Sequence, residues 1–160
     1  MNKQLFVFFA TVLAAALLVA GCGSSDDNGT TASLSKAQFV KQGNAICRKG
    51  NAQIESEFEE FAEEHHLGKH EKPSKKVLAE ATETVLIPAI TTQIEGLRAL
   101  GAPEGDEGEI DEILSGAEEA LEEAEEDPAA FTEGEPTKFK QVNKKARAYG
   151  LTVCAEEGNE

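Results

Sequence analysis

The chain has 160 residues, of which 28% are charged, and its 30 acidic and 15 basic side chains give a net charge of −15. A chain of this length folds as one domain, because single hydrophobic cores are typically built from roughly 100 to 150 residues. So negative a protein repels phosphate backbones and anionic headgroups, and we expect no nucleic acid among its partners. Eight Phe, one Tyr and no Trp favour helices over strands and predict an all-α fold.

The N-terminal 21 residues have the pattern of a secretory signal peptide. Lys3 precedes an apolar run of 16 residues at 5–20, LFVFFATVLAAALLVA. A spanning helix needs roughly 20 apolar residues, so this run is short for a permanent anchor and matches the hydrophobic region of a signal peptide. The pattern predicts export.

The apolar run ends in Val19-Ala20-Gly21-Cys22, which resembles the lipobox of bacterial lipoproteins. In that family a small residue precedes the scissile bond, and the cysteine thiol receives diacylglycerol. The resemblance implies cleavage between Gly21 and Cys22, covalent diacylglycerol on Cys22, and attachment to the extracytoplasmic face of the cell membrane. Fatty acyl chains, such as palmitate, then form the lipid anchor.

The alternatives are an ordinary secretory signal with a chance cysteine, or an uncleaved short helix. The next residues argue against both, since 23–33, GSSDDNGTTAS, are too polar to fold and suit the tether of an anchored domain. We therefore divide the chain into the signal peptide (1–21), the lipidated cysteine with its flexible polar tether (22–34) and an acidic helical domain (35–160).

The first helix of that domain is predicted to start at Lys36. Ser35 is the N-cap, Gln38 completes a capping box, and Gly68 and Pro73 end the element. Apolar and small residues at three- and four-residue spacing form one stripe along it: Phe39, Gly43, Ile46, Cys47, Gly50, Ile54, Phe58 and Phe61. The two glycines on this stripe predict close packing of a neighbouring helix.

The second helix is predicted over 74–100, with a kink at Pro88. Gly101 suits its C-terminal cap, and Pro103 suits the restart of the chain as the third helix. A broad apolar surface predicts that the second helix is central: Val77, Leu78, Ala81, Val85, Leu86, Ala89, Ile90, Ile94, Leu97 and Leu100.

The third helix carries a narrow apolar stripe and stops at Asp127 and Pro128: Ile110, Ile113, Leu114, Ala117, Ala120, Leu121 and Ala124. The last helix starts near Pro136 and places on one face Phe139, Val142, Ala146, Tyr149, Gly150, Val153 and Cys154. Five cations of the last helix partly balance the acidic third helix: Lys138, Lys140, Lys144, Lys145 and Arg147. Four amphipathic helices with linkers of moderate length predict a four-helix up-down bundle.

Two cysteines remain once the lipobox has accounted for Cys22. Cys47 and Cys154 are an even pair in an exported domain, on the stripes of the first and last helices, which an up-down bundle brings side by side. We predict a disulfide between them. The alternative is two buried thiols. Redox catalysis is disfavoured because the sequence has no Cys-x-x-Cys motif.

The segments around these cysteines are Asn44-Ala45-Ile46-Cys47 with Asn51, and Tyr149-Gly150-Leu151-Thr152-Val153-Cys154. They resemble those of a group of uncharacterised actinobacterial-type helical lipoproteins with two cysteines. The resemblance covers the two end helices. It implies a bundle clasped by a disulfide and implies no activity.

All three histidines lie in one short segment, as His65, His66 and His70. Such a cluster outside the cytoplasm suggests zinc or copper, although Gly68 weakens the helix that would place His66 and His70 on one face. The alternative that we favour is a solvated helix end, with His65 pointing inward. Haem and thioether copper sites are disfavoured because the one methionine is Met1.

A run of carboxylates in the third helix suggests weak calcium binding or, as we favour, a solvated helix face: Glu118, Glu119, Glu122, Glu123, Glu125, Glu126 and Asp127. The sequence offers no nucleophile elbow, so we expect no enzyme and no cofactor apart from the covalent lipid. The resulting hypothesis is a membrane-anchored lipoprotein whose domain is a non-catalytic module for an envelope protein or a small molecule. A metal-binding lipoprotein using the three histidines is the alternative.

Overall fold

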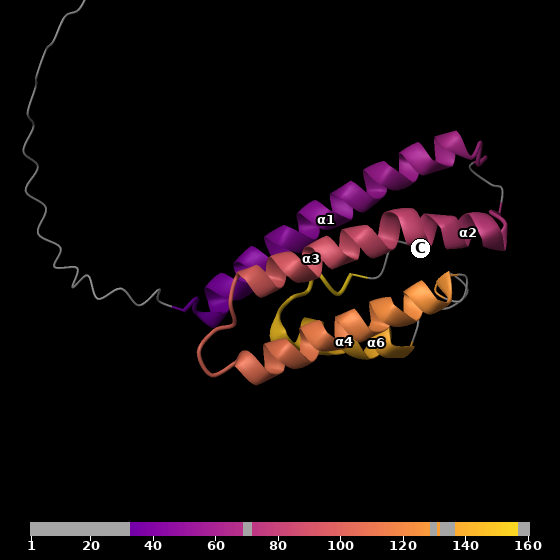
Figure 1. Ribbon diagram of the computed structural model, residues 1–160. Coiled ribbons are helices and arrows are strands. Elements are labelled where there is room, and N and C mark those ends of the chain that lie inside the picture. Colours follow the sequence, from indigo (N-terminus) through magenta and orange to yellow (C-terminus); the bar gives the residue numbers. More distant parts are fainter. Residues whose placement is uncertain (1–32, 69–71, 129–130, 132–136, 157–160) are drawn as a thin grey trace, which may run out of the picture. The chain divides into compact units, whose positions relative to one another are not determined.

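The computed structural model describes residues 33–68, 72–128, 131 and 137–156, and all regular structure within them is helical (Figure 1). The predicted all-α fold is confirmed. The elements are α1 (Lys36–Glu64), α2 (Lys75–Ala81), the π-helical turn η1 (Thr82–Leu86), α3 (Ile87–Ala99), α4 (Glu107–Glu126) and α6 (Thr137–Tyr149). Within the described ranges, no helix is both long enough and apolar enough to cross a membrane. The predicted signal peptide, Cys22, the tether up to residue 32 and His70 lie outside the described residues.

The start of α1 follows the predicted capping box. The Gln38 backbone N–H donates to Ser35 Oγ at 3.3 Å, and the Ser35 backbone N–H donates to Gln38 Oε1 at 2.9 Å. Two of the backbone donors at the helix start are thereby satisfied by side chains. The sequence placed this start at the correct residue.

The end of α1 was predicted wrongly, because the helix stops at Glu64 and not at Gly68. His66 has a φ of 53°, its N–H donates to Glu63 O at 3.1 Å, and the Leu67 N–H donates to Ala62 O at 2.9 Å. This bond pattern is a Schellman motif, with histidine at the left-handed position that glycine usually takes. Leu67 then packs against an apolar cluster around Phe61, which gives the motif its hydrophobic contact.

The second predicted helix is continuous through Pro88 but passes through a π-helical turn, η1. The Ile87 N–H donates to Thr82 O, five residues back. A proline ring clashes with the carbonyl four residues earlier, and the wider turn just before Pro88 relieves that clash. Hydroxyls of nearby threonines accompany the distortion, since Thr82 Oγ1 donates to Leu78 O at 3.1 Å and Thr84 Oγ1 to Glu80 O at 2.7 Å. The helix therefore accommodates Pro88 through a π-helical turn that directly precedes it.

The helices pack in chain order: α1 on α3, α3 on α4, and α4 on α6 (Figure 1). The helix α1, the continuous segment from α2 to α3, α4 and α6 run in alternating directions, in agreement with the predicted up-down topology. The central place predicted for the second helix is confirmed, because α3 contacts both α1 and α4. The α3–α4 connection differs from the prediction, since α4 begins at Glu107, after a turn at Gly105 (φ 87°), and not at Pro103.

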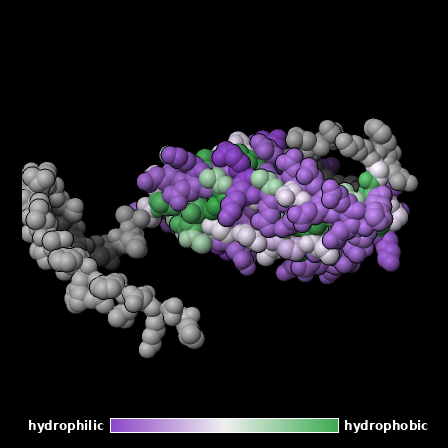
Figure 2. Space-filling view, turned by 90° about the horizontal axis from the view of Figure 1, so that it is seen from above, coloured by the Kyte–Doolittle hydropathy of each residue, from purple (hydrophilic) through white to green (hydrophobic). Residues whose placement is uncertain are grey.

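Two apolar clusters form the core. The larger includes Phe39, Ile94, Leu97 and Leu151, and the smaller joins Phe61 to Ala81 and Val85 of the second helical segment. All seven residues predicted for the stripe of α4 are buried. Hydrophilic side chains cover most of the face in Figure 2, and hydrophobic ones gather at the end where α1 begins.

The last helix ends at Tyr149, so Cys154 does not lie on a helix as predicted. Gly150 has a φ of 114°, its N–H donates to Arg147 O at 3.2 Å, and the Leu151 N–H donates to Ala146 O at 2.8 Å. This second Schellman motif turns the chain away from the helix axis. Residues 150–156, here called the C-terminal strap, leave α6 at this point and reach α1.

The side chain of Tyr149 ties three elements together at one end of the bundle. Its ring packs edge-on against Phe39 with centroids 6.0 Å apart, and its hydroxyl donates to Asp106 Oδ2 at 2.7 Å. Lys36 Nζ lies 3.9 Å from the centre of the ring and 3.8 Å from Asp106 Oδ2. The start of α1, the α3–α4 turn and the end of α6 therefore share one contact.

The glycines on the stripe of α1 give a test of the close packing. A Cβ added at Gly43 would lie 2.6 Å from Leu151 Cδ2 and 2.9 Å from Leu97 Cδ2. We expect Gly43→Ala to lower the free energy of unfolding by about 1 kcal/mol or more, because overpacking (about 1–3 kcal/mol) outweighs the gain in helix propensity (about 1 kcal/mol). Urea denaturation measures the change.

Gly108 in α4 is the matched control, because a Cβ there meets nothing within 4 Å. Gly108→Ala is expected to stabilise the protein by up to about 1 kcal/mol through helix propensity alone. A Gly43→Ala variant as stable as the wild type would contradict close packing at this position.

Alkaline pH is expected to destabilise the fold through Tyr149. Burial first, and then the hydrogen bond to Asp106, raise the pKa of Tyr149 above its ordinary value of 10.0. The folded protein therefore holds this proton more tightly than the unfolded chain. The stability that protonated Tyr149 contributes to the fold is fully present below pH 10 and is lost as the pH rises above that value.

Tyr149 is the only tyrosine and the chain has no tryptophan, so tyrosinate absorbance reports this one group. We expect its titration midpoint to be higher in the folded protein than in urea, and Tyr149→Phe to remove its part of the alkaline loss of stability. Equal midpoints in the folded and unfolded protein would refute the burial argument.

Candidate functional site

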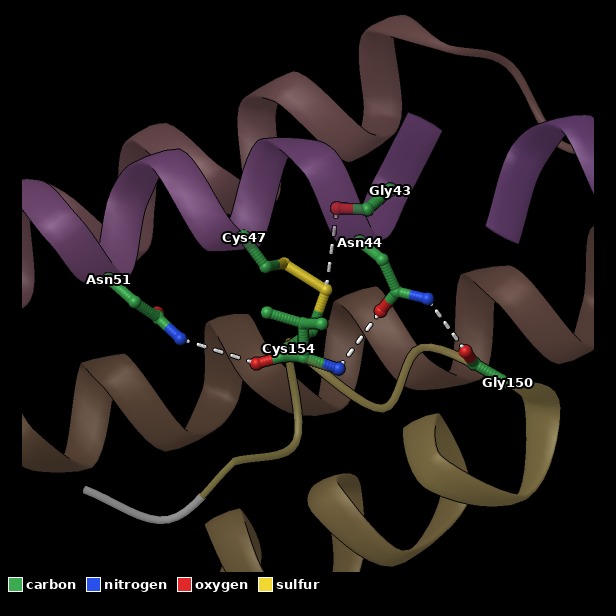
Figure 3. The surroundings of a disulfide bond; sticks show 7 residues. Gly43, Asn44, Cys47, Asn51, Gly150 and Cys154 are labelled. Atoms are coloured by element: carbon green, nitrogen blue, oxygen red, sulfur yellow. Dashed lines mark hydrogen bonds between the residues drawn. A yellow bond between two sulfur atoms is a disulfide. The ribbon is translucent and has the colours of Figure 1, made fainter. Parts of the chain in front are cut away.

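A disulfide joins Cys47 of α1 to Cys154 of the C-terminal strap, with Cα atoms 5.0 Å apart (Figure 3). The predicted pairing is confirmed, but the predicted reason for it is wrong. The two cysteines do not come from helices packed side by side; the C-terminal strap leaves α6 and brings Cys154 to α1. The bond links positions 107 residues apart.

Two asparagines of α1 hold the backbone of the C-terminal strap beside the disulfide (Figure 3). Asn44 Nδ2 donates to Gly150 O at 2.9 Å, and Asn44 Oδ1 accepts from the Val153 N–H at 2.9 Å. Asn51 Nδ2 donates to Val153 O at 3.3 Å. Asn44, Cys47 and Asn51 are spaced by three and four residues and so share one face of the helix. These amides replace the backbone partners that an irregular segment lacks.

The C-terminal strap also contributes side chains to the core. Leu151 and Ala155 are 1% and 0% exposed, and both belong to the larger apolar cluster. The strap is therefore part of the folded core, although its sequence pattern predicts a last helical turn. The signal that marks its start is Gly150 directly after Tyr149, the arrangement of a helix C-terminus.

Two of the three histidines are described, and both have structural contacts. The His65 ring stacks on Phe61 with centroids 4.1 Å apart, and its Nε2 lies 3.8 Å from Glu80 Oε1. His66 is exposed at the left-handed position that ends α1. No group of three potential ligands of the His, Cys, Asp or Glu types gathers within the described ranges, and His70 lies outside them. The metal alternative thus rests on the sequence spacing.

Several carboxylates of the acidic run form ion pairs. Arg98 of α3 donates through Nε and Nη2 to the two oxygens of Glu118, at 2.7 and 2.8 Å. This pair lowers the pKa of Glu118 and raises the pKa of Arg98. Lys138 of α6 lies 2.9 Å from Glu123 and 3.4 Å from Glu119. The predicted charge balance between the last two helices is confirmed at this position.

A shallow hollow of about 350 Å³ lies on α6, lined by Lys140, Asn143, Lys144, Arg147 and Ala148. These positions follow the pattern i, i+3, i+4, i+7 and i+8 and so share one face of the helix. Arg147 Nη2 donates to Ala155 O of the C-terminal strap. The charges of these side chains predict charge balance with α4 and do not by themselves predict a common surface. The missed signal is their spacing, which separates them from Lys138 and Lys145.

No known protein family, curated protein or solved structure was found to match the chain.

The asparagine contacts give a test of how the C-terminal strap is held. We expect Asn44→Ala to lower the free energy of unfolding by about 2–3 kcal/mol, because it leaves a half-buried carbonyl and a half-buried N–H without partners, at about 1–3 kcal/mol each. Urea denaturation under oxidising conditions, with the disulfide intact, measures the loss.

Gln53 is a suitable control on the same helix, since its amide donates to Glu57 at 2.8 Å on the exposed surface. Gln53→Ala is expected to change stability by less than about 0.5 kcal/mol. If Asn44→Ala changed stability as little as Gln53→Ala, the disulfide alone would account for the position of the strap.

Proposed function

We propose that the protein is a membrane-anchored extracytoplasmic lipoprotein whose helical domain is a non-catalytic binding or structural module. The observation that carries the proposal is the order of the N-terminal segments: an apolar run, the Val19-Ala20-Gly21-Cys22 motif, and a polar linker. Each segment has a separate part in this function, namely export, lipid attachment and separation of the domain from the membrane.

The disulfide supports the proposed location. Disulfides form and persist in oxidising compartments and are rare in the cytoplasm of most organisms. The Cys47–Cys154 bond closes a long loop, which stabilises a small domain by about 4–5 kcal/mol in the chain-entropy treatment. An exported domain is where a bond of this kind persists.

The linker sets the working distance of the domain. From their composition we expect residues 23–33 to act as a flexible tether, with a root-mean-square reach of about 18 Å from Cys22. Two acyl chains contribute about 0.8 kcal/mol per buried methylene and hold the anchor stably, so no basic membrane-binding patch is required. A domain tethered in this way can meet an envelope protein or a small molecule near the membrane surface.

The non-catalytic role is supported by how the described polar groups are used. His65 stacks on Phe61, Asn44 holds backbone, and Arg98 joins α3 to α4. The Ser115 hydroxyl, which donates to Asp111 Oδ1 at 3.3 Å and accepts from Arg98 Nη2 at 3.2 Å, belongs to the same exposed network between α3 and α4.

The proposal is tested by the state of Cys22 in cells. We expect mass spectrometry of the membrane fraction to find an N-terminus at Cys22 carrying diacylglycerol, and Cys22→Ser to abolish that modification. The matched control is the double variant Cys47→Ser with Cys154→Ser, which is expected to keep the lipid. An unmodified Cys22, or a mature N-terminus at another residue, would refute the proposal.

A further inference from the structure

The cations of α6 divide into two groups with different surroundings. Lys138 and Lys145 point to the neighbouring helix, where Lys138 pairs with Glu123 and Lys145 with Glu112 of α4. Lys140, Lys144 and Arg147 line the hollow on another face, together with Asn143. One helix thus separates cations that hold the bundle together from cations that share a surface concavity.

The hollow gathers cations in a chain whose acidic side chains outnumber the basic ones by 30 to 15. Neither Lys144 nor Arg147 forms an ion pair with a carboxylate of the described residues. Their charges therefore add at the hollow, which favours a negatively charged group there.

The side chains that line the hollow favour an anion. Lysine and arginine side chains only donate hydrogen bonds and carry a positive charge, so Lys144 and Arg147 present donors to the hollow. The Arg147 guanidinium is planar and can bind two oxygens of one phosphate or carboxylate. Lys144, three residues earlier on the same face, adds a compact positive charge. The volume of about 350 Å³ is within the lower range of small-ligand sites.

The C-terminal strap orients the guanidinium. Arg147 Nη2 donates to Ala155 O, and the neighbouring Cys154 is bonded to α1 through Cys47. Ala155 is fully buried, so its carbonyl is a fixed acceptor. Holding one nitrogen in place reduces the side-chain entropy that Arg147 loses on binding a ligand and leaves its other N–H groups for that ligand.

We propose that this hollow on α6 binds a phosphate group, with Lys144 and Arg147 as the principal ligands. The inference rests on the proposed function in one respect, that the domain is a binding module, and it supplies the chemical class of the ligand. The phosphate belongs either to a small soluble molecule or to a lipid headgroup. Both present the same oxygens to the same donors.

The test is titration calorimetry of the full-length chain in a non-ionic detergent, with pyrophosphate as the soluble probe. In a second arm, micelles doped with phosphatidylglycerol or with phosphatidylcholine provide the lipid headgroup. We expect saturable binding of pyrophosphate, of phosphatidylglycerol, or of both, in preference to phosphatidylcholine. Affinity should fall as salt rises, because the contacts are exposed charges.

Lys144→Ala and Arg147→Ala are each expected to weaken binding about tenfold or more, since each removes a charge-assisted contact. Arg147→Lys separates charge from geometry and should restore affinity only in part. The matched control is Lys145→Ala, which removes an equal charge from the adjacent position outside the hollow and should bind like the wild type.

Three results would overturn the proposal: no binding of either phosphate probe, equal affinity of the wild type, Lys144→Ala and Arg147→Ala, or an equal loss in Lys145→Ala. If Arg147→Ala unfolds, Lys144→Ala still tests the site, because the Lys144 side chain is exposed and its loss leaves the core intact. Pyrophosphate binding does not depend on lipid at Cys22, so a negative result would leave the anchoring to its own test.

Discussion

The covalent bond between Cys47 and Cys154 is the constraint on which the C-terminal part of the domain depends. It fixes the C-terminal strap to α1 across 107 residues, and Asn44 and Asn51 then satisfy the backbone of that segment. Once the strap is in place, Leu151 enters the core beside Gly43, and Ala155 O becomes an acceptor for Arg147. One bond therefore closes the core and orients a surface side chain.

The rest of the bundle is organised around α3, which contacts both α1 and α4. Apolar burial supplies the attraction, and charge determines which faces remain at the surface. Arg98 and Lys138 meet glutamates of α4, while Lys144 and Arg147 line the hollow on α6. Exposed pairs of this kind contribute little stability, about 0–1 kcal/mol each, so their main effect is on how the surface charge is distributed.

In the proposed function, the three cysteines and the two sets of cations have distinct parts. By that proposal Cys22 is the lipid attachment site, whereas the Cys47–Cys154 disulfide joins the C-terminal strap to α1. The acidic majority of the surface keeps the domain soluble and repels anionic surfaces in general, whereas the hollow on α6 offers a local exception for a small anionic group. A tethered domain with such a site can select a phosphate-bearing ligand without docking non-specifically on the membrane.

The sequence by itself determined the helical class, the capping box at Ser35, the buried stripe of α4 and the pairing of Cys47 with Cys154. These features depend on residues close in the chain or on a simple count of cysteines. Only the tertiary structure decided where α1 stops, how Pro88 is absorbed, and that Cys154 lies on a strap after α6. It also decided which cations of α6 meet glutamates and which line the hollow. The physical reason is that a helix ends, bends or turns a face outward according to what packs against it. Leu67 and Leu151 gain apolar contacts just beyond the ends of α1 and α6. That gain outweighs the local propensity to continue the helix.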